Sequence, residues 1–348
     1  MGARYNENMI FEEGGTAPSS VASPPSDPVA TPPARRPGSM RRTSTVLMFW
    51  PEGFGTDLCL RGRARDLLTP TIGQPEVVGT SDLYAVTGRE RDIRRIEADP
   101  APVGLERLVG SRAGANLRAS ISHELPDEVA AGTPLYLLLD DLAGSTLISG
   151  FAYLRWADQI PAIGDRISRA PRRIMRGICA GFADGASSLE SDGSISGLRQ
   201  NTARPAPLAD PRDPLSWHEL DDHPDIAMRR ARRIDVWNNC GILEIDAMFR
   251  DSCWDPDGAE VVVHEYEILA RADLSTGLLL SVTARPRVLP YVECPAAAAN
   301  ASWLAGTELR SLRTEVLQRL RGTDCCTHLN DGLRSLAEVP VLAAVLER

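Results

Sequence analysis

The residue types best suited to chemistry gather near the C-terminus, in the segment GTDCCTHL at 322–329. Cys326 and His328 lie two positions apart, where the pattern predicts the start of a helix. The positive end of a helix would lower the pKa of the Cys326 thiol. His328 is suited to acid/base work near neutral pH or to metal binding. Asp331, three residues later, would share its helix face and could orient it.

Two upstream side chains, Tyr291 and Cys294, could join this group as proton donors or substrate contacts. Cys294 together with Cys326 and His328 would form a compact Cys/His cluster similar to a zinc site. The four-ligand spacing of a zinc finger is absent. A structural interpretation also fits, in which both cysteines are small buried thiols and His328 caps the helix.

The same region resembles an uncharacterised bacterial family, a domain of unknown function, over roughly 230–340. The resemblance rests on Pro-Tyr, a Cys just beyond it and a terminal Gly-x-x-x-Cys-Thr-His-Leu, and it implies no particular activity. The matching positions are Pro290, Tyr291, Cys294, Gly306, Gly322, Cys326, Thr327, His328 and Leu329, with Asp246 and Asp251 fitting more loosely. Cys325 departs from the family, which usually has Gly at this position.

A second candidate site is the acidic run Asp221, Asp222 and Asp225, interrupted by His223 and Pro224. Clustered carboxylates can bind magnesium and a diphosphate, and the run resembles the acidic motif of terpene cyclases. Those enzymes are all-helical and rich in aromatic residues, whereas this chain has strand-like blocks and 5% aromatic residues. The run therefore also fits a turn at the end of a linker.

An Arg stripe is the third candidate. Arg61, Arg63 and Arg65 would share one face of a strand and could bind a carboxylate or phosphate. A solvated strand face explains them equally well. The sequence has no Gly-rich phosphate loop, dinucleotide fingerprint or Gly-x-Ser-x-Gly elbow, so the corresponding chemistries have no local support.

The elements that would position these residues fall into two blocks, 41–183 and 225–348. Alternating Val-, Ile- and Leu-rich segments predict antiparallel strands, and three- and four-residue spacing after Cys294 predicts helices. We therefore expect an α+β fold of two related units, each an antiparallel sheet with about three helices on one face. Gly132–Ser145 aligns with Gly322–Ser335 without a gap, which suggests an internal duplication with a degenerate first copy.

The remaining segments are low in apolar residues. Residues 1–40 are rich in Pro, Ser and Thr and predict a disordered tail, and 184–224 predicts a linker. The chain has 348 residues, a net charge of −9 and seven cysteines in no regular spacing. With no apparent signal or membrane segment at the N-terminus, this favours a cytoplasmic protein with reduced thiols. The negative charge argues against nucleic-acid binding.

Three functions remain open. The first is a cofactor-independent lyase or isomerase of the hydratase, dehydratase or cyclase type, acting on a mostly apolar acyl, polyketide or terpenoid-like molecule. Arg250, Asp251 and Thr327 would contact this substrate. The second is a non-catalytic binding or assembly scaffold. The third is a metal-dependent enzyme, with zinc at the Cys/His cluster or magnesium at Asp221–Asp225. We expect a small-molecule partner, no nucleic acid and no membrane, and leave a homodimer open.

Overall fold

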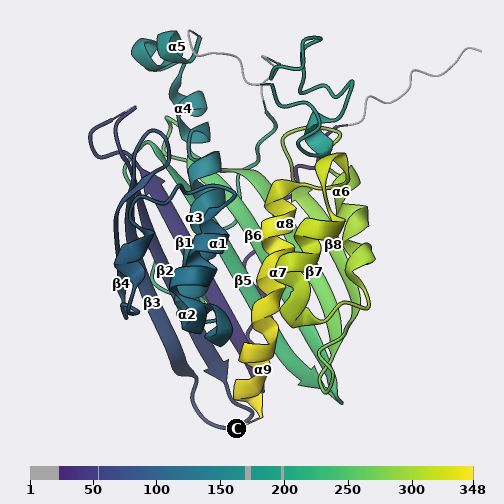
Figure 1. The fold of residues 1–348 in the computed structure, drawn as a ribbon. Helices are drawn as coiled ribbons and strands as arrows, with labels where there is room; N and C mark the ends of the chain where they lie inside the picture. The colour runs from purple at the N-terminus through teal and green to yellow at the C-terminus, as the bar shows by residue number, and fades with distance from the viewer. Residues whose placement is uncertain (1–22, 54, 169–173, 197–199, 348) are drawn as a thin grey trace, which may run out of the picture.

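The computed structural model describes residues 23–53, 55–168, 174–196 and 200–347. Within them the chain forms one eight-stranded antiparallel sheet with the strand order β4-β3-β2-β1-β5-β6-β7-β8 (Figure 1). The strands are β1 (Ser39–Phe49), β2 (Leu58–Thr69), β3 (Glu76–Thr87), β4 (Ile93–Asp99), β5 (Ala227–Asn239), β6 (Ile242–Trp254), β7 (Glu260–Asp273) and β8 (Leu279–Val288).

Each half of the sheet is a four-stranded meander followed by helices, so the α+β class and the antiparallel strands are confirmed. The first half continues into α1 (Leu117–Glu124), α2 (Pro126–Ala131), α3 (Pro134–Ile148), α4 (Phe151–Trp156) and α5 (Pro161–Ser168). The second half continues into α6 (Ala296–Ala299), α7 (Leu312–Arg319), α8 (Thr327–Ser335) and α9 (Val339–Leu346). Short 3-10 turns connect several of these helices.

We had expected each half to form a sheet of its own, but the two halves share one sheet. β1 and β5 pair along their length, from Ser39 opposite Trp237 to Phe49 opposite Ala227. Ten of the eleven residues of β1 are buried, because layers cover both faces of the sheet at its centre. The centre of the sheet thus joins the two halves through one continuous ladder of backbone hydrogen bonds.

The helices cover one face of the sheet. α3 packs against β1, β2 and β3, α8 packs against β6 and β7, and α9 lies over β5 and β1 (Figure 1). α3 begins where Thr133 accepts a hydrogen bond from the backbone N–H of Tyr136, with Pro134 at its first position. Residues Pro134–Trp156 are long and apolar enough to cross a membrane, but 78% of the most apolar window is buried in the protein, as in a core helix.

The opposite face is covered by the segments that we expected to be a tail and a linker. Residues 1–22 lie outside the described part of the chain. Residues 23–38, which we call the strap, cross the sheet, and the backbone N–H of Val29 donates to Glu265. In the connecting segment, Trp217 is buried against Ala231 and Met248, and His218 is hydrogen-bonded between Thr43 and Thr45. The composition of the segment does not predict this packing, because only a few side chains, such as Trp217, hold the segment on the sheet.

Candidate metal centre

A chain of ion pairs runs between the sheet and the helices, linking the two halves of the molecule. It contains six arginines and six carboxylates, so the buried charges balance. The members are Arg42, Asp66, Arg118, Asp140, Asp141, Arg230, Arg232, Asp251, Arg313, Asp331, Arg334 and Glu338. Balanced pairing is what allows so many charges to remain in the interior.

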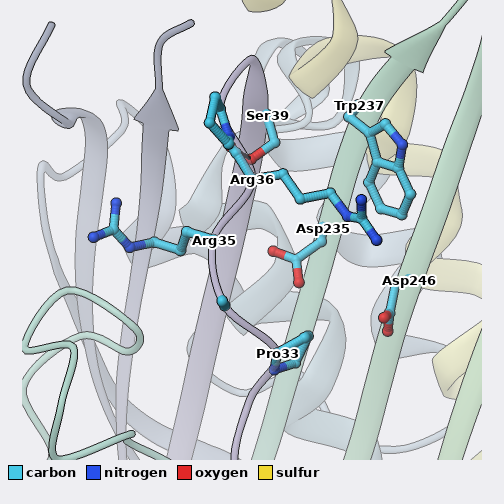
Figure 2. Close-up of a pocket in the computed structure, with 9 residues that line it drawn as sticks. Pro33, Arg35, Arg36, Ser39, Asp235, Trp237 and Asp246 are labelled. Atoms are coloured by element: carbon cyan, nitrogen blue, oxygen red, sulfur yellow. Dashed lines mark hydrogen bonds between the residues drawn. The ribbon is translucent and has the colours of Figure 1, made fainter. Parts of the chain in front are cut away.

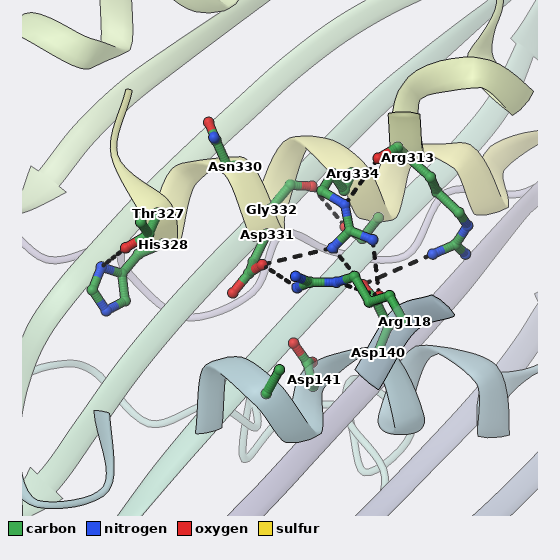
Figure 3. A network of polar contacts seen from close by, with 12 residues as sticks. Arg118, Asp140, Asp141, Arg313, Thr327, His328, Asn330, Asp331, Gly332 and Arg334 are labelled. Carbon is green, nitrogen blue, oxygen red and sulfur yellow. Dashed lines mark hydrogen bonds and ion pairs between the residues drawn. The ribbon is translucent and has the colours of Figure 1, made fainter. Parts of the chain in front are cut away.

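The middle of this network joins α3 to α8 (Figure 3). Asp140 on α3 accepts two hydrogen bonds of 2.9 Å from Arg334 on α8 and one of 2.9 Å from Arg118. Arg118 also donates to Asp331 at 2.8 Å. Burial alone would raise the pKa of Asp140, but Arg334, Arg118 and Arg313 together hold it far below its usual range. The carboxylate is therefore charged at any physiological pH.

The network ends at a group of three side chains that could ligate a metal ion: Asp251 on β6, His264 on β7 and His328 on α8. One ligand atom from each lies within 4.8 Å of the other two. Asp251 stands directly opposite His264 in the β6–β7 ladder, next to a β-bulge. Such bulges redirect side chains and are common beside functional sites. Here the bulge leaves both His264 and Asp251 facing the helices.

The two imidazoles of this group lie face to face. Their ring centroids are 3.6 Å apart with 14° between the planes, and the Nε2 atom of His328 lies 3.8 Å from Oδ2 of Asp251. Nδ1 of His264 is buried and has no hydrogen-bond partner among the described residues. The other nitrogen of His328, Nδ1, lies 3.5 Å from Oγ1 of Thr327 and 3.9 Å from Sγ of Cys326.

Both imidazoles are neutral in this setting. Burial lowers the pKa of His264 well below its usual range, and the adjacent His328 lowers it further. Burial, followed by the positive charge of Arg230, lowers the pKa of His328 to about 3. Asp251 is fully buried and is fixed by Arg230, which donates to its two oxygens at 2.9 and 3.0 Å. Neutral imidazole and ionised carboxylate are the forms that bind metals.

Comparison with known families places this group inside a recognisable domain. Residues 228–342 match DUF2889, a protein family of unknown function. No curated protein and no solved structure matches the chain. The DUF2889 match covers about a third of the chain and includes Asp251, His264 and His328, together with β5 to β8 and most of the helices that follow. The expected domain of unknown function is thereby found.

The thiols of Cys326 and Cys294 are less reactive than we expected from the sequence. Cys326 precedes α8 as its N-cap residue, but the burial of its side chain outweighs the helix end, and its pKa is raised rather than lowered. Burial, and next Cys326, raise the pKa of the Cys294 thiol. Tyr291 is buried and accepts a hydrogen bond of 3.1 Å from Gln200. These three residues belong to one buried core cluster, and only Cys326 among them has a contact with His328 in the described part of the chain. All seven cysteines are free.

The acidic partner of His328 also differs from the expected one. Asp331 binds Arg118 at 2.8 Å and Arg230 at 3.0 Å, so it belongs to the ion-pair network, and Asp251 is the carboxylate that approaches the Nε2 atom of His328. Of the expected substrate contacts, Thr327 lies beside His328. Arg250 points to the opposite face of the sheet and binds Glu265 at 2.6 Å, because neighbouring strand residues face opposite ways.

The remaining sequence candidates are not brought together as sites. Asp221 pairs with Arg63 at 3.3 Å, and His223 stacks on Trp254 with centroids 3.5 Å apart. Among the described residues, Asp221, Asp222 and Asp225 do not form a group with metal-ligand spacing. Arg61 and Arg63 lie on the outer face of β2, where Arg65 is buried and donates to the carbonyl of Leu215.

His264 is the ligand that sequence reasoning missed. It lies in VVVHEYEILA, a run that predicts a buried strand, where a single histidine is the exception. The available signal was a histidine on the strand that follows the one carrying Asp251, because consecutive antiparallel strands are neighbours. Which residue of β6 lies opposite His264 depends on the β-bulge, and the sequence pattern does not reveal the bulge.

Proposed function

We propose that this protein is a metal-dependent enzyme whose divalent cation is bound by Asp251, His264 and His328. The observation that carries the proposal is the meeting of two neutral imidazoles and one carboxylate within 4.8 Å. Two histidines and a carboxylate form the ligand set of non-haem iron sites and of many catalytic zinc sites. Three protein ligands leave positions for water and substrate, whereas structural zinc sites use four.

The surroundings of the three residues support ligation. Arg230 fixes the Asp251 carboxylate, and it is itself compensated by Asp141 and Asp331 at 3.3 and 3.0 Å. Partners of this kind orient the ligands of metal sites and tune their affinity. The Nδ1 atom of His328 faces Thr327 and Cys326, so its Nε2 atom is the one directed toward Asp251. His328 also keeps 14% of its side-chain surface exposed, which gives an ion a route from solvent.

The reaction that we propose remains of the lyase or isomerase type on a small organic molecule. A divalent cation with open positions lowers the pKa of a bound water and polarises carbonyl groups. Both effects serve hydration, dehydration and isomerisation. A metal-dependent lyase or isomerase has more support than a cofactor-independent one, because Cys326 and Cys294 are buried thiols with raised pKa values.

The first half of the sheet supports the proposal that the chain arose by duplication and that only one copy kept the centre. Asp66 binds Arg42 as Asp251 binds Arg230. A β-bulge follows Asp66 as one follows Asp251. The residue opposite Asp66, however, is Gly79 instead of a histidine. In the sequence alignment, Leu138 takes the place of His328, so the first copy lacks both imidazoles.

Metal content of the purified full-length protein tests the proposed centre. We expect about one equivalent of zinc, iron or added cobalt(II) per chain in the wild type, and its loss in His264→Gln and Asp251→Asn. His218→Gln is the matched control, because His218 is equally buried but lies on the other face of the sheet. No saturable binding of any of these ions, or equal binding by His264→Gln, would refute the proposal.

A further inference from the structure

A separate pocket lies on the opposite face of the sheet, between the strap and strands β5 and β6 (Figure 2). Its volume is about 350 Å³, within the range typical of small-molecule sites, roughly 300–1,000 Å³. Pro33, Pro37 and the ring of Trp237 supply apolar surface, and Arg36, Asp235 and Asp246 supply charge. The pocket therefore combines carbon contacts with a small number of charged groups.

Most of these charges are already compensated. Asp235 accepts hydrogen bonds from Nε and Nη2 of Arg41, at 2.6 and 2.9 Å. Arg233 donates to Asp235 and, at 2.7 Å, to Asp246. Arg35, on the strap, binds Asp213 through two hydrogen bonds of 2.7 and 2.9 Å. In each of these groups the positive and negative charges balance.

Arg36 is the exception. Its side chain is exposed and reaches across the sheet toward Trp237, while Arg35 points the opposite way (Figure 2). The guanidinium carbon lies 4.5 Å from the centroid of the indole ring. Within the part of the chain that the structure describes, the guanidinium makes no ion pair. A guanidinium stacked in this way is held in position while its N–H edge stays available to an anion.

We propose that this pocket binds a small organic carboxylate through Arg36. The guanidinium fork matches a carboxylate with two parallel hydrogen bonds, and Pro33, Pro37 and Trp237 would contact the carbon skeleton. A single negative charge matches Arg36, which among the described residues lining the pocket is the one arginine without an ion pair. A doubly charged phosphate would keep one negative charge without a counter-ion, because Asp235 and Asp246 already occupy Arg41 and Arg233. The inference is independent of the proposed metal centre, which lies on the other face of the sheet.

Calorimetric titration of the full-length protein with benzoate tests this assignment. We expect saturable binding that weakens about tenfold or more in Arg36→Gln, as expected when hydrogen bonds to a charged group are lost. Benzamide, the neutral analogue, should not bind. Arg61→Gln is the matched control, because Arg61 is an exposed arginine over the Phe49 ring, at 5.4 Å, away from this pocket.

Two further measurements distinguish benzoate bound at Arg36 from benzoate bound to a metal ion or at a phosphate site. Binding of benzoate should persist in His264→Gln. If benzoate instead coordinated a metal ion at the other face of the sheet, this substitution would abolish its binding. Inorganic phosphate should compete weakly. The proposal is overturned if wild-type protein does not bind benzoate, if Arg36→Gln binds it as the wild type does, or if phosphate binds more tightly than benzoate.

Discussion

Replacing Gly144 by Ala would test whether the ion-pair network is as closely packed as the structure indicates. Gly144 lies on α3, and a Cβ atom there would meet Nη1 of Arg230 at 2.1 Å and Oδ2 of Asp331 at 2.6 Å. Both distances are far below van der Waals contact, so Arg230 must move away from Asp331 or from Asp251. The substitution therefore acts on the buried charges without removing any of them.

The expected loss of stability follows from two opposing effects. Disturbing a buried ion pair costs about 3–5 kcal/mol, whereas Ala is favoured over Gly within a helix by about 1 kcal/mol. We expect Gly144→Ala to lower the free energy of unfolding by about 2–4 kcal/mol, measured by denaturant titration. Metal affinity should fall as well, because Arg230 would no longer hold both oxygens of Asp251.

Gly150→Ala is the control for this experiment. Gly150 also has helical backbone angles, and a Cβ atom there would have no neighbour within 4 Å. We expect this variant to be as stable as the wild type or slightly more stable. If Gly144→Ala unfolds within about 0.5 kcal/mol of the wild type, Arg230 is not confined as described, and the proposed coupling between the network and the metal centre is refuted.

Two further predictions concern other buried groups. Burial lowers the pKa of His218 to about 3. Below about pH 6.5 the imidazole is therefore protonated in the unfolded chain but stays neutral in the folded protein. Stability falls as the pH drops through this window, by about 2 kcal/mol from this group between pH 7.5 and 5. Unfolding titrations should show a smaller fall in His218→Asn, and an unchanged fall would contradict the assignment. Glu338→Gln should cost about 3–5 kcal/mol, because Arg42 and Arg313 would lose a fully buried partner. Glu315→Gln, which breaks only the exposed pair with Arg319, should cost less than about 0.5 kcal/mol in the same assay, and equal losses would refute the difference.

Much of the fold could be predicted from periodicity. Runs such as VVVHEYEILA and LLLSVTARPRVL predict strands, and the later spacing predicts helices, as the structure confirms. The beginning of β5, MRRARR, does not show the apolar alternation of a half-buried strand. In the structure its arginines alternate between the two faces and are all buried, since carboxylates from other elements meet most of them.

The candidate site was only half predictable. The Cys-Thr-His motif drew attention to His328 because residue type and spacing are local properties. Its partners are set by strand register, and a shift of one residue would turn His264 to the other face. Asp331 has the right spacing on α8 to orient His328, yet it binds two arginines supplied by α1 and β5. Sequence spacing cannot weigh such distant competitors for one carboxylate.

The pairing of β1 with β5 has a consequence for the boundaries of the family domain. Residues 228–342 contain β5 but not β1, so a chain cut to this segment would expose a long, unpaired strand at its margin. It would also lose Asp141 and leave Arg232 deprived of its counter-ion. The N-terminal half thus covers the edge of β5, which would otherwise be free to pair with a strand of another chain.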